Sequence, residues 1–291
     1  MVNYIGAVFR PPSEAQSLII QATLGCSHNK CTFCGSYLDK PFKIRSLEEI
    51  RQDLEDARYM GPVRRVFLAD GDALSIPQKR LVQIHEAVNE YIPSVERIGI
   101  YANARDILRK SVEELEELAA LKLGIVYLGV ETGDAELLEK ICKGATYEQL
   151  VEAAHRVKQA GTALSVTVLL GIGGIEGSRR HARETAKILT DMDPDYVGAL
   201  SVILVPGTPL HQEHMEGKFQ VPDPFELIEE LRVMIAESSF TNCVFRSNHA
   251  SNYLPVKATL PQDKEGILRA IDRVLEARDG ASLRPEFLRA L

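Results

Sequence analysis

The sequence predicts an α/β protein built on a parallel sheet, and three observations support this fold class. Apolar segments that suit buried strands alternate with segments of helical periodicity along most of the 291 residues. The predicted strands follow one another at intervals of roughly 30 to 40 residues, which is the length of a βαβ unit. The strands are also continuously apolar, as in VFLA, IVYLGV and SVTVLL, which is typical of strands buried on both faces.

Each predicted strand ends where the residue types change. The β-rich run at 17–24 leads into a loop with three cysteines, and the run at 65–69 stops at Asp70-Gly71-Asp72. The strand at 124–130 ends at Glu131-Thr132-Gly133. The remaining strands are predicted at 97–101, 163–170 and 196–205.

The helices between the strands are predicted from their caps and breakers. Ser46 with Glu49, and Ser111 with Glu114, match the capping-box pattern at a helix start. Pro77 suits a first helical turn. Helices are predicted at about 46–59, 77–91, 111–122, 134–142, 147–160, 178–192 and 224–238, and a last amphipathic helix at 262–278.

The predicted elements suggest three parts of the chain. Residues 1–16 form an irregular lead-in, residues 17–240 form the main domain, and residues 241–291 form a C-terminal extension. No Ser/Gly linker separates the extension, so we expect it to pack on the main domain.

The charge composition of the chain limits which class of molecule it is expected to bind. Lys and Arg number 34 against 41 Asp and Glu, a net charge of −7, and no basic block stands out. This does not favour nucleic acid or an anionic membrane, and we expect a small-molecule or protein substrate. No apolar run approaches a membrane span, and the first ten residues do not resemble a secretory signal. We therefore expect a cytoplasmic protein, and the odd, clustered set of five cysteines suits a reducing compartment.

The cysteine loop is the main chemical motif. Cys26, Cys31 and Cys34 are separated by four and two residues, and three thiolates so close together favour an iron-sulfur or zinc site. A structural zinc site needs a fourth ligand, either His28 or a distant residue, whereas a four-iron cluster with three protein ligands leaves one iron open for chemistry. Three buried thiols without a metal are the third interpretation.

These cysteines, with Phe33 directly before the last of them, resemble the cluster loop of the radical S-adenosylmethionine (SAM) enzymes. The motif style is closest to the oxygen-independent coproporphyrinogen oxidase and tRNA methylthiotransferase branch, although the family's usual gaps are three and two residues. The resemblance covers about 17–238 and implies a partial TIM-type (β/α)6 barrel with a short C-terminal extension. It also implies a [4Fe-4S] cluster on Cys26, Cys31 and Cys34, with SAM bound at the open iron. In that family one electron from the cluster cleaves SAM into methionine and a 5′-deoxyadenosyl radical.

The same resemblance suggests SAM contacts at the strand ends. Asp70, Gly71 and Asp72 stand where the family receives the SAM ammonium group, although an Asp-Gly turn that merely ends a strand is the alternative. Glu131 stands at a ribose-binding position. Lys143 lies twelve residues later, at a carboxylate-binding position, and its alternative is a solvated lysine after a helix.

Further contacts to the adenine and ribose are implied by the resemblance alone. Phe33 is the usual adenine contact of the cluster loop. Thr167 stands where the branch often has a ribose-binding Asp, and Leu169 and Val205 fall in segments that line the adenine. The polar segment 246–253 is predicted either to close over a substrate or to be a solvated loop.

The implied activity needs an electron donor such as flavodoxin or ferredoxin and anaerobic conditions, because an open cluster is sensitive to oxygen. No residue is assigned to catalysis on the substrate itself. The rival function is a non-catalytic haem or iron-sulfur carrier on the same fold, because relatives of this branch include haem chaperones. A zinc-binding structural domain is the third hypothesis.

Overall fold

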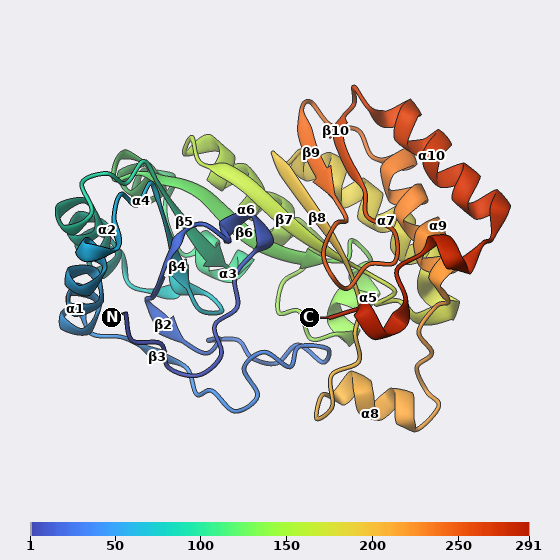
Figure 1. The fold of residues 1–291 in the computed structure, drawn as a ribbon, viewed down its shortest axis with the longest axis horizontal. Helices are drawn as coiled ribbons and strands as arrows, with labels where there is room; N and C mark the ends of the chain where they lie inside the picture. Colours follow the sequence, from blue (N-terminus) through green and yellow to red (C-terminus); the bar gives the residue numbers. More distant parts are fainter. Residues whose placement is uncertain (1, 291) are drawn as a thin grey trace. The chain divides into compact units, whose positions relative to one another are not determined.

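The structure places the strands in the predicted order along the chain. The computed structural model describes residues 2–290 and is drawn as a ribbon in Figure 1. The strands are β1 (Leu18–Gln21), β2 (Thr23–Leu24), β3 (Lys43–Ile44), β4 (Arg65–Ala69), β5 (Arg97–Ala102), β6 (Leu123–Glu131), β7 (Ala163–Leu170), β8 (Tyr196–Ser201), β9 (Cys243–Arg246) and β10 (Lys257–Leu260).

Helices follow the strands of the sheet and include the predicted ones. They are α1 (Leu47–Ala57), α2 (Gln78–Tyr91), α3 (Ala104–Leu108), α4 (Val112–Ala120), α5 (Ala135–Lys140), α6 (Tyr147–Gln159), α7 (Gly174–Met192), α8 (Pro209–Met215), α9 (Pro224–Glu237) and α10 (Lys264–Ala277). Both predicted capping boxes are present, at Ser46 with Glu49 and at Ser111 with Glu114. Each such cap stabilises its helix by about 1 kcal/mol, which explains why these helix starts were predictable.

Eight strands form one sheet in the order β1-β4-β5-β6-β7-β8-β9-β10, and β2 pairs with β3 apart from it. β1 is parallel to β4, with Gln21 opposite Ala69. The chain therefore leaves these two neighbouring strands at the same edge, toward the cysteine loop and toward Asp70. β9 is parallel to β8, whereas β10 runs antiparallel to β9. The prediction of a parallel α/β sheet is confirmed.

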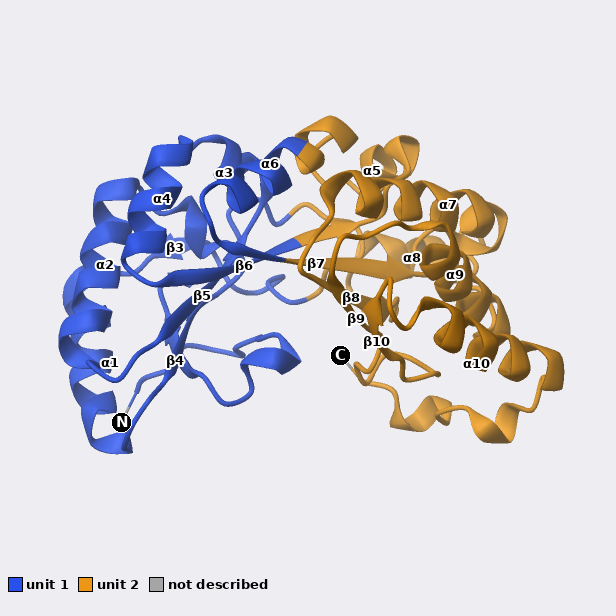
Figure 2. Cartoon of the chain, turned by 90° about the horizontal axis from the view of Figure 1, so that it is seen from above, with its two compact units in different colours: residues 1–29, 36–128, 152–164 blue, residues 30–35, 129–151, 165–291 orange. Residues whose placement is uncertain are grey.

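The chain divides into two compact units, coloured separately in Figure 2. Unit 1 comprises Met1–Asn29, Ser36–Leu128 and Glu152–Leu164, and unit 2 comprises Lys30–Gly35, Gly129–Val151 and Ser165–Leu291. The strands β6 and β7 run through both units. The division also crosses the cysteine loop, so that Cys26 belongs to unit 1 and Cys31 and Cys34 belong to unit 2.

Each unit has its own apolar core. In unit 1 the rings of Phe67, Tyr101 and Tyr127 meet edge to face, with centroids 4.9 Å apart for Phe67–Tyr101 and 5.6 Å apart for Phe67–Tyr127. In unit 2 one cluster is formed by buried residues in or just after α5, β7 and β8, at the start of α8 and in the segment before α9: Leu137, Ile141, Leu169, Ile172, Val202, Leu210 and Phe219. The unit 2 core thus includes residues of the segments that follow β7 and β8.

The structure differs from the prediction at several element ends. Helix α7 begins at Gly174 rather than at 178, because the glycines expected to form a loop continue as its first turn. The strand expected to reach 205 ends at Ser201, whose backbone N–H donates to Ser251 Oγ. Helices α3 and α8, of five and seven residues, and strand β10 were not predicted, because such short segments carry little periodic signal.

Candidate functional site

In unit 1 the cysteine loop begins with a turn that only glycine fits. Gly25 has a φ of +68°, and a Cβ on it would lie 2.3 Å from the backbone oxygen of Lys40. The half-exposed Cys26 follows directly. A Cβ on Gly71 would lie 2.6 Å from Cβ of Cys26. The segment after β4 can therefore approach the cysteine loop closely only because Gly71 has no side chain.

Asp70 supports this turn through one carboxylate oxygen. Oδ2 accepts hydrogen bonds from Lys40 Nζ at 3.0 Å, Gln21 Nε2 at 3.3 Å and the backbone N–H of Gly25 at 3.3 Å. Burial raises the pKa of Asp70, and the Lys40 ammonium opposes that rise. The other oxygen, Oδ1, is buried without a hydrogen-bond partner in the described part of the chain.

Asp72 holds the next residues of the loop. It accepts from the backbone N–H of Ser27 at 3.1 Å, from the Ser27 hydroxyl, and from Asn103 Nδ2 at 2.9 Å. Arg105 Nη2 in turn donates to the Ser27 hydroxyl oxygen at 2.7 Å. Burial raises the pKa of Asp72 to about 6, against the lowering effect of these hydrogen bonds. Both aspartates of the predicted SAM motif therefore fix the backbone that carries Cys26.

In unit 2 the second half of the loop is held by backbone hydrogen bonds and apolar packing. The N–H of Thr32 donates to Ile141 O at 3.0 Å, and the N–H of Leu210 donates to Thr32 O at 2.9 Å. Phe33 packs on the unit 2 core cluster, which includes Leu169. The structure thus brings together two of the residues predicted to line the adenine.

Val205 and Thr167 complete the predicted apolar and ribose contacts of unit 2. A Cβ on Gly35 would lie 2.3 Å from Val205 Cγ1, so the end of the cysteine loop packs directly against Val205. Thr167 is half-buried in the middle of β7, opposite Gly198 of β8. Their contact with a cofactor stays a prediction.

Glu131 and Lys143 form an ion pair with each other. Lys143 Nζ lies 2.9 Å from Glu131 Oε1, and the two side chains are 9% and 11% exposed. Glu131 has a φ of +66°, which turns the chain sharply at the end of β6. A Cβ on Gly129 would lie 2.3 Å from Glu131 Oε1, so the glycine makes room for the pair. The predicted roles in binding ribose and carboxylate are not tested by this geometry.

The donor set of the loop suits a cluster. None of Cys26, Cys31 and Cys34 forms a disulfide, and all three are half-exposed. Within residues 2–290 no three His, Cys, Asp or Glu side chains lie together as ligands of one metal ion. A cubane cluster makes a different demand, because each cysteine binds a different iron and the sulfurs stand apart from one another.

Sequence reasoning missed four side chains that hold the loop. Lys40, Ser27, Asn103 and Arg105 all contact Asp70, Asp72 or each other, as described above. Of these four, only Asn103 could have been identified from the sequence. It directly follows β5, and a polar residue at the carboxyl end of a parallel strand is a candidate site residue. Lys40 lies in an irregular segment without periodicity.

The polar segment 246–253 is tied to its own unit. Asn252 Nδ2 donates to the backbone oxygens of Ala199 and Ser247, each at 2.8 Å, and its Oδ1 accepts from Ser201 Oγ at 2.8 Å. Arg289 Nη2 donates to Val202 O at 3.0 Å. Asn252 and Arg289 therefore attach the C-terminal segment to the end of β8. Closure of segment 246–253 over a substrate stays a prediction.

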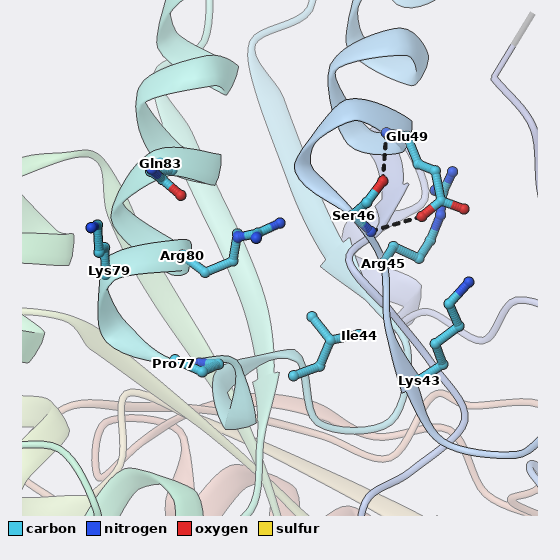
Figure 3. Close-up of a pocket in the computed structure, with 9 residues that line it drawn as sticks. All are labelled: Lys43, Ile44, Arg45, Ser46, Glu49, Pro77, Lys79, Arg80 and Gln83. Atoms are coloured by element: carbon cyan, nitrogen blue, oxygen red, sulfur yellow. Dashed lines mark hydrogen bonds between the residues drawn. The ribbon is translucent and has the colours of Figure 1, made fainter.

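Unit 1 also contains a pocket of about 750 Å³ at the N-terminal ends of α1 and α2. In Figure 3 Arg80 extends from α2 toward α1, whereas Lys43 extends away from α2. Glu49, also in the lining, caps α1 through Ser46. The cations of this pocket do not converge on one point, and none of the predicted site residues lines it.

Comparison with known proteins places this geometry in a family. The model of the Radical SAM superfamily matches residues 20–189, more than half of the chain, including the cysteine loop and the ends of β4, β6 and β7. Among the described residues, no helix combines the length and the apolar character needed to span a membrane.

Several curated proteins are similar over two thirds of the chain. An uncharacterised methyltransferase of Pyrococcus horikoshii is 25% identical over 66% of this chain and 40% of that protein. An uncharacterised protein of Methanocaldococcus jannaschii is 27% identical over 70% of this chain and 66% of that protein. The haem chaperone HemW of Bacillus subtilis is 19% identical over 66% of this chain and 53% of that protein. The chain thus spans between 40% and 66% of the length of these relatives.

Two solved structures share the fold. Methylornithine synthase (PylB) has a TM-score of 0.55 at 22% identity, over 77% of this chain and 63% of that one. Coproporphyrinogen III oxidase (HemN) from Escherichia coli has a TM-score of 0.55 at 16% identity, over 76% of this chain and 51% of that one. The predicted partial TIM-type barrel class is confirmed, and the similarity to HemN and HemW matches the expected branch. On the match to residues 20–189, the chain belongs to the radical SAM superfamily.

Proposed function

We propose that this chain is a radical SAM enzyme whose Cys26, Cys31 and Cys34 hold a [4Fe-4S] cluster. The observation that supports it most is the anchoring of the cysteine loop inside the matched family region. Asp70 and Asp72 fix the loop at Cys26 in unit 1, and Thr32 fixes it beside Cys31 and Cys34 in unit 2. Both anchors involve residues outside the loop, as expected for a loop that must present ligands in a fixed geometry.

When bound, the cluster and SAM supply the electron transfer and the 5′-deoxyadenosyl radical that the superfamily uses. The chain's own residues bind and orient the cofactor. In unit 1 the buried and unpartnered Oδ1 of Asp70, next to the open backbone of Gly71, suits a cationic group such as the SAM ammonium. Asp72 acts on the cofactor through the loop that it holds.

In unit 2 the ion pair of Glu131 and Lys143 provides a carboxylate acceptor and an ammonium donor for SAM. The carboxylate can accept from ribose hydroxyls, and the ammonium can bind a carboxylate. Phe33, Leu169 and Val205 offer apolar surface for the adenine, while the half-buried Thr167 offers a hydroxyl to the ribose. Each of these roles is part of the proposal.

The proposal includes an electron donor such as flavodoxin or ferredoxin and a small-molecule or protein substrate. It also includes an anaerobic, reducing compartment such as the cytoplasm, because the three loop cysteines must remain thiols. The relatives' names include a methyltransferase and a haem chaperone, so the proposal extends to SAM cleavage and not to one substrate.

Anaerobic reconstitution tests the proposal. The protein loaded with iron and sulfide is expected to bind about four irons per chain and, with dithionite and SAM, to release 5′-deoxyadenosine detectable by mass spectrometry. Cys26→Ala, Cys31→Ala and Cys34→Ala should each abolish that product. Cys142→Ala is the matched control, because Cys142 is an exposed cysteine outside the loop. Equal product from all four variants would contradict the assignment.

A haem carrier is the second candidate, supported by the similarity to HemW. Titration of the apoprotein with haem separates it from the enzyme. Saturable, stoichiometric haem binding by a protein that does not cleave SAM would favour the carrier.

A further inference from the structure

A buried polar cluster lies behind the strand ends of unit 2 and takes no part in the proposed chemistry. His181 comes from the middle of α7 and Glu230 from the middle of α9, and the two residues are 0% and 2% exposed. His181 Nε2 and Glu230 Oε2 lie 3.8 Å apart. Both residues lie among apolar neighbours of their helices, so water does not solvate them.

The histidine side of the cluster holds the loop after β6. His181 Nδ1 lies 2.8 Å from Thr132 Oγ1 and 3.3 Å from Thr185 Oγ1. The backbone N–H of Gly133 donates to Thr185 Oγ1 at 3.1 Å. A Cβ on Gly133 would lie 2.0 Å from the backbone oxygen of Glu184, so this loop lies directly against α7. Thr132 is the residue that follows Glu131.

The glutamate side holds the turn after β7. The backbone N–H of Gly171 donates to Glu230 Oε2 at 2.6 Å. Gly171 has a φ of +81°, and a Cβ on it would lie 2.7 Å from Leu227 Cδ2 of α9. This turn begins two residues after Leu169. The cluster therefore connects both loops to the same pair of packed helices.

Burying a histidine and a glutamate is unfavourable unless the two side chains are hydrogen-bonded, and apolar side chains could not form these bonds. Here each side chain binds a loop next to a proposed SAM contact, which is Glu131 at the end of β6 in one case and Leu169 near the end of β7 in the other. We infer that His181 and Glu230 are positioning residues that set the affinity for SAM by fixing the loops after β6 and β7. This inference rests on the proposed function.

The first test uses the apoprotein and needs no cofactor. Glu230→Leu removes the acceptor for the Gly171 N–H, whereas Glu230→Gln keeps an oxygen there. Amide hydrogen exchange at 170–174 is expected to rise about tenfold in the leucine variant and less than threefold in the glutamine variant. Glu229→Gln is the matched control, because Glu229 is the exposed neighbour on the same helix. Equal exchange in all four proteins would overturn the inference.

The second test measures the SAM dissociation constant of the reconstituted protein. Glu230→Leu should weaken binding about tenfold, and Glu230→Gln should restore it to within about threefold of the wild type. Leu231→Ala controls for lost stability, because Leu231 is a buried apolar residue of α9. It should lower the melting temperature and leave SAM affinity unchanged.

Thr185→Val keeps the test decisive if the leucine variant does not fold. It preserves side-chain shape, removes the acceptor for the Gly133 N–H, and should weaken SAM binding about threefold to tenfold. Wild-type affinity in Thr185→Val and Glu230→Leu, or equal weakening by Leu231→Ala, would refute the positioning role. A wild-type protein that binds no SAM would instead refute the proposed function, and the exchange test would still decide whether the cluster fixes the loops.

Discussion

The buried carboxylates at or behind the strand ends have different hydrogen-bond partners in the two units. In unit 1 Asp70 and Asp72 accept from backbone N–H groups and side chains of the cysteine loop and its neighbours. In unit 2 Glu131 pairs with Lys143, while Glu230 accepts from a glycine N–H beside a neutral histidine. The contacts of unit 1 shape a loop, whereas the Glu131–Lys143 pair in unit 2 joins two side chains, which in our proposal bind ribose hydroxyls and a carboxylate.

This difference shows that acidic residues at the ends of neighbouring strands need not have equivalent contacts. Asp70 and Asp72 accept from backbone N–H groups of the cysteine loop, and we expect them to contribute mainly to stability and cluster loading. Glu131 pairs with a lysine side chain and not with that loop, and we expect it to contribute mainly to ligand binding, because a side-chain partner can turn toward a ligand at small cost. The predictions below test that division.

Lys40→Met is expected to have the largest effect. It leaves Asp70, whose side chain is 0% exposed, without its cationic partner, and breaking a buried pair in this way costs about 3 kcal/mol of unfolding free energy. Denaturant unfolding of the apoprotein at pH 7 measures the loss. Arg58→Met is the control from the exposed pair with Glu55 and should leave the free energy of unfolding almost unchanged.

The double variant Lys40→Met/Asp70→Asn sharpens this result. Removing both charges should recover part of the lost stability, because no ion remains unpaired. No recovery would mean that Lys40 stabilises unit 1 by packing and not by compensating Asp70.

Glu230→Gln should change how stability depends on pH. Burial raises the pKa of Glu230 to about 7, from about 4.5 in the unfolded chain. Its contribution to stability is therefore full below pH 4.5 and is lost as the pH rises through 7. The stability of Glu230→Gln relative to the wild type should rise over that range by at most about 3 kcal/mol.

His181, 3.8 Å from Glu230, has a pH dependence of the opposite sign. Burial lowers the pKa of His181 to about 4, so its contribution is lost as the pH falls from 6.5 through 4, whereas that of Glu230 is lost as the pH rises. Urea unfolding at half-unit steps from pH 4.5 to 8 measures the difference. A constant difference would show that folding does not raise the pKa of Glu230.

Much of the fold followed from local patterns, whereas the side-chain network did not. The strand at 65–69 and the strand at 163–170 were predicted at their observed bounds, because each is an apolar run closed by Asp or Gly. The strand ends also marked Asp70, Asp72 and Glu131 as site residues. Their partners come from segments distant in sequence, such as Lys40, and no local pattern encodes such a contact.

Glu230 and His181 are recognisable from the sequence as ionisable residues on the apolar faces of predicted helices. Glu230 lies three residues after Leu227 and four before Met234, within the apolar stripe of α9, and all three are buried. His181 lies in the same way beside Ala182 on the buried face of α7. An ionisable residue on the apolar face of a helix is a candidate for a buried hydrogen-bonded role, and periodicity alone identifies it.

Lys143→Met tests the ligand-binding side of the comparison. Loss of the ammonium should raise the SAM dissociation constant about tenfold, roughly 1.4 kcal/mol, because one charged contact is removed. Lys143→Arg keeps the charge and should retain affinity within about threefold. Equilibrium binding to the reconstituted protein measures both variants. Unchanged affinity with a large loss of stability would place the Glu131–Lys143 pair with the structural carboxylates of unit 1.

Ser27→Ala should have the smallest effect and tests which contact to Asp72 matters. The variant loses the hydroxyl that donates to Asp72 and accepts from Arg105, but it keeps the backbone N–H that donates to Asp72 at 3.1 Å. We expect a loss of about 1 kcal/mol in the unfolding free energy of the apoprotein and a normal iron content after reconstitution. If the geometry of the loop depends on the backbone contact, Ser27→Ala lowers the free energy of unfolding but leaves the iron content unchanged. If iron content falls with stability, the hydroxyl network of Arg105 and Asp72 holds Cys26 in place, and the side chain is then the more important anchor of the loop.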